Sequence, residues 1–249
     1  TLGQWMVLIQ FYENPGPLRD LLLKSVAEAF PEVNSLLYVI NQKANDTLYD
    51  QDIEVYQGKD YIEEAMGNLR FRINAKSFYQ TNSKQAIGLY DIVKEFAGLT
   101  GGQGVYDLYT GTGTIAQYLA AEAKWVVGIE SVSDAIQAAE ENAQHNHIEN
   151  AQFFVGDMKE LFDENFIAKH GKADVVITDP PRDGMHKSVV DQLIALGAPR
   201  IVYVSCNSAT QARDLALMKE HYKVVKSRAV DMFPQTHHVE NVVLLEKIQ

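Results

Sequence analysis

Residues 106–116 read YDLYTGTGTIA, and this stretch predicts a buried strand that passes through a glycine-rich turn into a helix. Gly111, Gly113 and Ala116 match the pattern G-x-G-x-x-A, in which glycines let the backbone approach a ligand closely. Glu130 ends the next predicted strand, 19 residues after Gly111, where a carboxylate can accept hydrogen bonds from a ribose diol. The pattern predicts an adenosine-containing ligand, with a plain glycine-rich turn as the alternative. NAD enzymes and S-adenosylmethionine (SAM) methyltransferases both use it.

From residue 104 onward, short apolar runs alternate with helical segments. Strands are expected at 105–109, 125–130, 152–155, 174–178, 200–205, 222–231 and 241–247, and helices at about 114–123, 133–146, 158–170, 187–196 and 208–220. This alternation predicts an α/β fold with a doubly wound, mostly parallel, seven-stranded sheet of Rossmann-like type. The last two strands lack a helix between them, so an antiparallel pair is expected at one edge. Ligands of such sheets bind beyond the carboxyl ends of the strands.

The first part of the chain has a different pattern. A strand is expected at 5–13 and a helix from Pro17 to Phe30, and four strand-like runs follow up to residue 74. We therefore expect a small α+β domain over residues 1–75 and a larger domain over 76–249. A helix from about Asn82 to Ala97 begins the second, with Asn82 and Gln85 resembling a capping box.

Composition narrows the classes of protein. The chain has 249 residues, 46% hydrophobic and 22% charged, which excludes wholesale disorder. The net charge is −11, whereas a protein that binds nucleic acid mainly through its overall charge is positively charged. No apolar run approaches the roughly 18 residues of a membrane span, and no leader is evident, so we expect a cytoplasmic protein without a membrane partner. The start at Thr1 suggests a fragment of a longer protein.

Two motifs mark the carboxyl ends of the third and fourth strands. DVVITDPPRDG, residues 174–184, brings Asp179 to the sheet edge, and Pro180–Pro181 fix a stiff turn. Enzymes that methylate nucleotide amino groups have an aromatic residue after Asp-Pro-Pro, so Arg182 argues against that chemistry; a purely structural turn is the alternative. Asp157, after the third strand, could contact an adenine amino group or cap a helix.

The only cysteine, Cys206, lies in VYVSCNSATQARDL, residues 202–215, at the same edge. One cysteine excludes intrachain disulfides and cysteine-clustered zinc or iron–sulfur sites. A polar loop before a helix N-terminus lowers a thiol pKa and favours a nucleophile, whereas a small buried side chain is the alternative. Ser208 and Gln211 resemble a capping box.

Glu240 opens the final predicted strand, after a turn rich in His and Gln, where a solvated loop carboxylate is the plain interpretation. The histidine pairs His237–His238 and His145–His147 are not spaced to ligate one metal together, so no metal site is predicted.

Five motifs in order resemble the RNA 5-methyluridine (uracil-5) methyltransferases, which use SAM to methylate uridine in ribosomal or transfer RNA. The motifs are FYQTN at 78–82, DLYTGTG at 107–113, DPPRDG at 179–184, SCNSAT at 205–210 and DMFPQTHHVE at 231–240. The resemblance covers residues 76–249, the catalytic part, and residues 1–75 resemble the family's small central domain. Family members often have Cys-Gly-Asn-Gly-Asn at Thr110–Thr114 and proline at Ser208. The family's N-terminal RNA-binding β-barrel and the iron–sulfur cluster of some members cannot be built from this chain.

The resemblance implies that Cys206 is the nucleophile and Glu240 the base, with Asp179 nearest the reacting groups. The residues expected to bind SAM are Gln80, Tyr109, Gly111, Thr114, Glu130, Asp157 and Asp179. The expected partner is RNA, with ribosomal RNA preferred over transfer RNA, and the chain is expected to be monomeric. Candidate RNA contacts are the cations Arg70, Arg72, Lys76, Lys84, Arg182 and Lys187 and the aromatic residues Phe78 and Tyr79, with a solvated charged face and core aromatics as the alternative.

Other functions remain open on sequence alone. An NAD-dependent oxidoreductase would use the same glycines and Glu130, but gives no reason for Cys206 and Glu240 at the active edge. RNA cytosine-5 methyltransferases typically use two cysteines, so the single cysteine of this chain disfavours that activity. A non-catalytic subunit that binds SAM or RNA is the third alternative.

Overall fold

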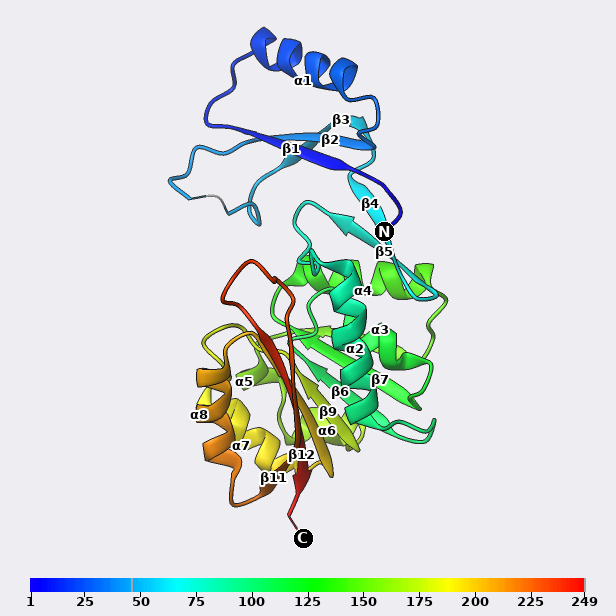
Figure 1. Ribbon diagram of the computed structural model, residues 1–249, viewed down its shortest axis with the longest axis vertical. Helices are drawn as coiled ribbons and strands as arrows, with labels where there is room; N and C mark the ends of the chain where they lie inside the picture. Colours follow the sequence, from blue (N-terminus) through cyan, green and yellow to red (C-terminus); the bar gives the residue numbers. More distant parts are fainter. Residues whose placement is uncertain (46, 249) are drawn as a thin grey trace. The chain divides into compact units, whose positions relative to one another are not determined.

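A computed structural model describes residues 1–45 and 47–248, which form two compact units, Thr1–Tyr79 and the part from Gln80 onward (Figure 1). Each unit has its own sheet and its own buried side chains. They are described separately below.

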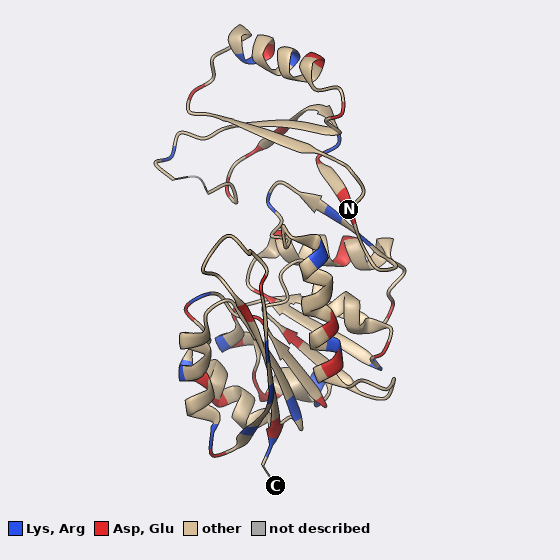
Figure 2. Ribbon diagram, viewed as in Figure 1, with Lys and Arg blue, Asp and Glu red and all other residues tan. Residues whose placement is uncertain are grey.

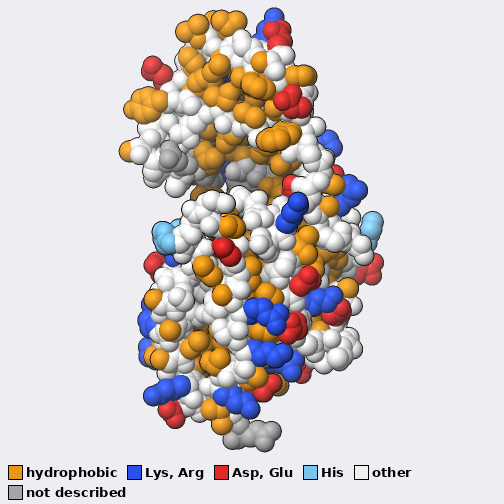
Figure 3. Space-filling model, viewed as in Figure 1, with side chains coloured by type: hydrophobic (Ala, Val, Ile, Leu, Met, Phe, Trp, Pro, Cys, Tyr) orange, Lys and Arg blue, Asp and Glu red, His pale blue; other side chains and the backbone are white. Residues whose placement is uncertain are grey.

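The first unit contains a three-stranded sheet covered by one helix. Its elements are β1 (Met6–Phe11), α1 (Pro17–Ala29), β2 (Ser35–Ile40) and β3 (Ile53–Gly58), with β2 central, parallel to β1 and antiparallel to β3. Pro17 occupies the first turn of α1, where its missing N–H costs nothing. Leu23 of α1 packs with Val33 and Leu36 in a small core. Leu18, Leu21 and Leu22 of the same helix are exposed. Figure 3 shows hydrophobic side chains on the surface of this unit.

A separate hairpin completes the first unit. Strands β4 (Tyr61–Met66) and β5 (Leu69–Asn74) pair antiparallel, with Met66 opposite Leu69. The tight connection between them passes through Gly67, whose φ of 58° lies in the left-handed region that glycine adopts readily.

The second unit has the expected alternation of strands and helices. Its elements are α2 (Ser83–Ala97), β6 (Gly104–Leu108), α3 (Thr114–Ala120), β7 (Trp125–Glu130), α4 (Ser133–His145), β8 (Ala151–Val155), α5 (Met158–Leu161), α6 (Glu164–His170), β9 (Val175–Thr178), α7 (Lys187–Leu196), β10 (Arg200–Ser205), α8 (Ser208–Met218), β11 (Tyr222–Val230) and β12 (Glu240–Lys247). The seven strands lie in the order β11-β12-β10-β9-β6-β7-β8. β12 runs antiparallel to both of its neighbours, β11 and β10, and the other pairs are parallel. The predicted fold class, including the antiparallel edge, is confirmed.

Helices cover both faces of this sheet, with α2, α3 and α4 on one side and α5 to α8 on the other (Figure 1). The central strands are therefore buried on both faces, which explains their nearly continuous apolar sequences. Tyr106 and Tyr203 are the largest fully buried side chains and belong to one apolar cluster with residues of α6 and α7. A rigid, filled sheet holds the loops at its carboxyl edge in place.

Two local predictions are wrong. The helix expected over 158–170 is split into α5 and α6, because the Asp163 side chain caps a new helix by accepting from Phe166 N at 2.8 Å. Ser208 and Gln211 do not form a capping box. Asn207 caps α8, and the buried Gln211 side chain donates instead to the backbone carbonyl of Tyr203 at 3.0 Å. The predicted cap of α2 is confirmed, since Asn82 accepts from Gln85 N.

Among residues 1–45 and 47–248, no helix has the length and apolar character that crossing a bilayer requires.

Candidate functional site

Several segments named from the sequence meet at one edge of the large sheet. Strands β6, β7, β8, β9 and β10 run parallel, so their carboxyl ends lie together. The residues at these ends or just beyond them include Gly111, Glu130, Asp157, Asp179 and Cys206. The topology thus assembles one candidate site from five separate loops.

The glycine turn after β6 uses its two glycines for different reasons. Gly111 and Gly113 both have positive φ, at 54° and 73°. A Cβ on Gly113 would lie 2.8 Å from the Phe153 ring and 2.9 Å from Ala139, so this glycine permits close packing of α3 on the sheet. A Cβ on Gly111 would meet nothing within 4 Å, so the backbone there faces open space. Gly111 therefore leaves room for a ligand to approach the turn.

A buried carboxylate holds the start of this turn. Asp107 is 1% exposed, and its Oδ2 accepts hydrogen bonds from Thr110 Oγ1 at 2.6 Å and Ala116 N at 3.1 Å. Burial raises the pKa of Asp107 to about 7, although both hydrogen bonds oppose the shift and Glu130 adds to it. Its Oδ1 has no hydrogen-bond partner among the described residues. Asp107 thus fixes the turn at an electrostatic cost.

Glu130, at the end of β7, is held in one orientation. Its Oε1 accepts from the backbone N–H of Ser131 at 2.7 Å and of Val132 at 3.1 Å. Its Oε2 lies 3.3 Å from Gly111 N, which donates to it. The carboxylate is therefore fixed beside the glycine turn, as recognition of a ribose diol requires.

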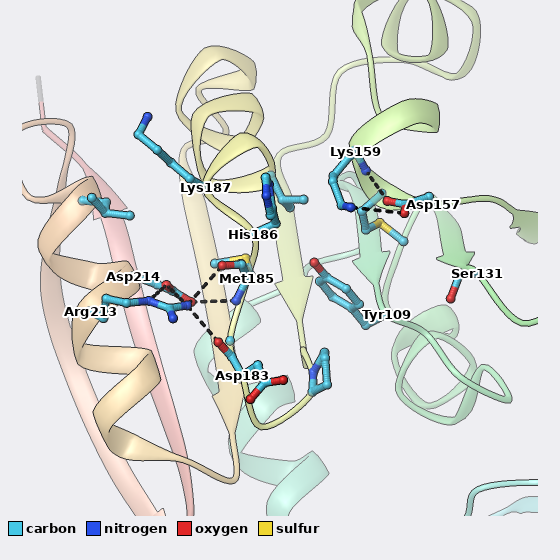
Figure 4. Close-up of a pocket in the computed structure, with 15 residues that line it drawn as sticks. Tyr109, Ser131, Asp157, Lys159, Asp183, Met185, His186, Lys187, Arg213 and Asp214 are labelled. Carbon is cyan, nitrogen blue, oxygen red and sulfur yellow. Dashed lines mark hydrogen bonds and ion pairs between the residues drawn. The ribbon is translucent and has the colours of Figure 1, made fainter. Parts of the chain in front are cut away.

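A cavity of about 720 Å³ lies beside these loops. Tyr109 projects into it, with Ser131 and Asp157 on one side and His186 on another (Figure 4). Asp157 also caps α5 by accepting from Lys159 N at 2.9 Å, so the helix-cap interpretation of this residue holds in the structure. Burial raises the pKa of Tyr109 to about 12, so its hydroxyl stays protonated at neutral pH.

Cys206, Asp179 and Glu240 lie close enough to influence one another. Burial raises the pKa of the Cys206 thiol, and the Glu240 and Asp179 carboxyls raise it further. The lowered thiol pKa expected from the helix N-terminus is therefore wrong, because desolvation and nearby acids outweigh it. Arg182 opposes this shift through its charge and a hydrogen bond to the thiol.

Both carboxyls of this group favour the protonated form more than an exposed acid does. Burial raises the pKa of Glu240, which is 9% exposed, and Arg182 opposes the shift. Burial also raises the pKa of Asp179 well above its ordinary value, with Glu240 and then Asp107 adding to the effect. One cation, one thiol and two acids with raised pKa values make a cluster suited to proton transfer.

Arg182 is anchored at its backbone and at its side chain. The carbonyl of Arg182 accepts from Asn207 Nδ2 at 3.1 Å and Thr210 Oγ1 at 3.0 Å. Its guanidinium lies 3.3 Å from Nε2 of His238. The Asp-Pro-Pro-Arg loop, the cysteine segment and the segment before Glu240 are thereby joined around the thiol.

Sequence reasoning missed the buried network that holds this loop. Asp214, 0% exposed, accepts from Met185 N and the Tyr203 hydroxyl, each at 2.8 Å. Arg213 pairs with Asp214 and donates to the Asp183 carbonyl at 2.9 Å (Figure 4). The sequence does contain a sign of this network. Asp214 is spaced three residues after Gln211 and four before Met218, so all three lie on one side of α8, and an acid on the buried side of a helix needs buried partners.

The remaining predicted residues lie nearby in sequence or on adjoining elements. Thr114 begins α3, and its hydroxyl is 3.1 Å from the Tyr90 hydroxyl. Gln80 is half-buried just before Asn82, whose Nδ2 donates to the Met232 carbonyl at 2.9 Å. This bond ties the FYQTN segment to the segment that leads to Glu240. Gln80, Gly111, Thr114, Glu130 and Asp179 do not line the large cavity, whereas Tyr109 and Asp157 do.

In the part of the chain that the structure describes, no cluster of three or more His, Cys, Asp or Glu side chains could hold a metal ion.

A profile of the tRNA (uracil-5-)-methyltransferases matches residues 48–248. The chain belongs to this family. Its resemblance to the uracil-5 methyltransferases is thereby confirmed. An uncharacterized RNA methyltransferase of Porphyromonas gingivalis is 59% identical over 98% of this chain and 53% of its own length. Another from Bacteroides thetaiotaomicron is 59% identical over 90% of this chain and 50% of its own length. The chain thus spans about half the length of the curated relatives it matches.

Among solved structures, a Pyrococcus abyssi tRNA (uracil-54, C5)-methyltransferase in complex with S-adenosyl-L-homocysteine has a TM-score of 0.80 at 35% identity. The similarity covers 96% of this chain and 56% of that one. A tRNA m1G37 methyltransferase of M. jannaschii, at 15% identity and a TM-score of 0.64, shares the fold alone.

Proposed function

We propose that this family member is the catalytic part of an RNA methyltransferase that moves a methyl group from SAM to carbon 5 of a uridine. The main support for this proposal is one group of side chains at the sheet edge where the glycine turn lies. The group consists of Cys206, Arg182 and Glu240. An NAD-dependent oxidoreductase would need the glycine turn but not this group of side chains. Family membership supports the same chemistry.

The residues around the glycine turn fit SAM. Gly111 leaves open space beside its backbone, and Glu130 is already oriented by three backbone N–H groups. The residues proposed to hold SAM are Gln80, Tyr109, Gly111, Thr114, Glu130, Asp157 and Asp179. When bound, SAM supplies an electrophilic methyl group.

Carbon 5 of uracil needs activation, because it is too weakly nucleophilic to attack a sulfonium methyl group. In the proposed mechanism the Cys206 thiolate adds to carbon 6, which produces an enolate with electron density on carbon 5. Burial raises the pKa of this thiol, so Arg182 supports the addition by favouring the thiolate. Burial raises the pKa of Asp179 well above the usual value, and this favours the protonated form, which donates a hydrogen bond to a uracil carbonyl oxygen in the proposed mechanism.

The methylated adduct must lose the carbon-5 proton before the thiol can leave. Glu240 is the proposed base, because burial raises its pKa and brings it closer to neutral pH, where a general base is most effective. Removal of the proton restores the double bond and expels the Cys206 thiolate. General-base catalysis of this kind typically contributes roughly 10²–10⁴ in rate.

For the substrate, we propose an unpaired uridine of ribosomal RNA, preferred over transfer RNA on the overall likeness of the motifs. The Pyrococcus abyssi neighbour acts on uracil-54 of tRNA by its title, so transfer RNA is the direct alternative. The base must lie in a loop or leave its stack to reach Cys206.

We further propose that the chain works as a cytoplasmic monomer, with residues 1–75 as its central domain and residues 76–249 as its catalytic domain.

Mass spectrometry of the intact protein after incubation with SAM and 5-fluorouridine RNA tests the chemistry. Fluorine at carbon 5 cannot leave as a proton, so we expect an adduct of protein, RNA and one methyl group. The adduct should be absent in Cys206→Ala and unchanged in the surface variant Asp191→Asn. With ordinary uridine RNA, Glu240→Gln should accumulate the adduct that wild type releases. Running ribosomal and transfer RNA fragments in parallel decides between the substrates.

Binding of S-adenosyl-L-homocysteine and RNA, measured on the same samples, separates loss of a binding site from loss of thiol addition. A wild-type sample that binds both and forms no adduct would contradict the proposed mechanism and favour a non-catalytic subunit.

A further inference from the structure

A second concave site lies in the first unit, remote in sequence from Cys206. Residues 47–49 and residues 75–78 enclose a hollow of about 330 Å³. The Lys76 ammonium donates to the Tyr49 carbonyl at 3.2 Å and so joins the two segments. The turn that carries Lys76 is held by Asn74, whose Oδ1 accepts from Lys76 N at 2.9 Å. The walls of the hollow are therefore fixed relative to each other.

Two aromatic side chains of this hollow are open to solvent. Phe78 is 71% exposed and Tyr49 is 59% exposed. The next residue, Tyr79, is half-buried and packs against Phe71, with ring centroids 6.2 Å apart. Tyr79 therefore fits the alternative given above, an aromatic residue packed against its neighbours. Phe78 has the exposed surface that base stacking requires. Exposed aromatic rings beside a lysine are typical of surfaces on which unpaired bases stack.

The charge pattern around the hollow is unusual for this chain. Within the first unit, residues 65–79 contain no Asp or Glu but include Arg70, Arg72 and Lys76, although the whole chain has a net charge of −11. Of these cations, Arg72 lies 3.8 Å from the Glu63 carboxylate across the β4–β5 hairpin. Figure 2 shows Lys and Arg colours, and no Asp or Glu colour, on the ribbon of β5. Asp50, which follows Tyr49 in the sequence, is paired with Lys43, and the hydrogen bond from Lys43 lowers the pKa of the Asp50 carboxyl. Lys76 is the cation that lines the hollow, and its positive charge is of the sign that a phosphate group requires.

We propose that this hollow, between Tyr49, Lys76 and Phe78, binds an unpaired nucleobase of the substrate RNA other than the uridine that is methylated. The two rings provide π-faces for the base, and Lys76 lies beside its phosphate. The volume falls within the range of about 300–1,000 Å³ that small-molecule sites occupy. This inference rests on the proposed function, because it assumes an RNA substrate.

The test is the affinity of the whole chain for a fluorescein-labelled, ten-nucleotide, single-stranded RNA of mixed sequence. Removing one stacking ring costs about 5- to 150-fold in affinity when a base stacks on it. We expect a loss in this range for Tyr49→Ala and for Phe78→Ala. Trp5→Ala is the matched control, since Trp5 is an aromatic residue of similar exposure, 62%, just before β1 and outside the hollow. Its affinity should equal that of wild type.

If Phe78→Ala does not fold, Phe78→Leu replaces it in the affinity measurement. Leucine keeps most of the apolar volume but has no aromatic ring on which a base can stack, so the same loss of affinity is expected. Each variant is compared by melting temperature before its affinity is interpreted. Equal affinities for wild type and both ring variants would overturn the inference, as would wild type that does not bind the RNA. The binding assay needs no turnover, so the two proposals can fail separately. If Tyr49→Ala and Phe78→Ala lose affinity but wild type forms no adduct with 5-fluorouridine RNA, the proposed methylation is rejected and the base site is supported.

Discussion

The Oδ2 atom of Asp214 accepts a hydrogen bond from the backbone N–H of Met185 at 2.8 Å, and this contact joins α8 to the loop that carries Asp179 and Arg182. Cys206 lies just before α8, so this contact connects the helix that follows the thiol to the loop that carries Arg182. Gly184 makes the contact possible. A Cβ there would lie 2.7 Å from Asp214 Oδ2, and the φ of 75° also favours glycine.

Asp214→Asn should loosen this loop. The variant loses the negative charge that faces Arg213 and weakens the bonds to Met185 and Tyr203. We expect the free energy of unfolding to fall by about 1–3 kcal/mol. Urea denaturation measures it, with Asp191→Asn as the control, because Asp191 forms an exposed pair with Lys187. We also expect kcat to fall roughly 10- to 100-fold with little change in the dissociation constant of S-adenosyl-L-homocysteine. Equal kcat in both variants would show that the network does not position the site.

Arg182→Gln should make the thiol less reactive. Arg182 is the group that lowers the pKa of Cys206, so its removal leaves burial and the Glu240 carboxyl unopposed and the pKa rises further. At any pH below the pKa the thiolate fraction falls about tenfold per pKa unit. The rate of Cys206 alkylation by iodoacetamide, measured between pH 7 and 10, should shift to higher pH, whereas Lys187→Gln should follow the wild-type curve. An unchanged curve in Arg182→Gln would remove Arg182 from thiol activation.

Gly111→Ala and Gly113→Ala should fail in different ways. A Cβ added at Gly113 would clash with Phe153 and Ala139, so we expect Gly113→Ala to destabilise the fold by a few kcal/mol. A Cβ added at Gly111 meets no protein atom within 4 Å, so Gly111→Ala carries only the strain of a positive φ, about 1 kcal/mol. Its affinity for S-adenosyl-L-homocysteine should fall at least roughly tenfold in isothermal titration calorimetry, because the methyl group fills the space left for the ligand. Full affinity in Gly111→Ala would place the ligand elsewhere.

Asp107→Asn should stabilise the protein increasingly as pH rises. The pKa of Asp107 is raised from 3.8 to about 7, so the unfolded chain releases this proton at a lower pH than the folded one. Wild type therefore loses stability between about pH 4 and pH 7, by about 4 kcal/mol at most. Asparagine has no charge to desolvate and can still accept from Thr110 and Ala116 through its side-chain oxygen. Urea denaturation at pH 5 and pH 8 measures the difference, and a pH-independent difference would contradict the buried charge.

Much of the fold and the place of the site follow from the sequence. Strand and helix periodicities predict the alternating elements, and the rule that parallel strands share a carboxyl edge brings Gly111, Glu130, Asp179 and Cys206 together. These conclusions need only local pattern and a general property of parallel sheets, so they did not require coordinates.

Only the tertiary structure decided the electrostatics and the fine positioning. The pKa of Cys206 is raised because burial and Glu240, distant in sequence, outweigh the local helix terminus. Asp214 becomes a buried anchor because Met185 of the loop after β9 and Tyr203 of β10 both donate to it, whereas Arg213 pairs with it from the same helix. Desolvation and through-space charge depend on what packs around a group, and no sequence window contains that information.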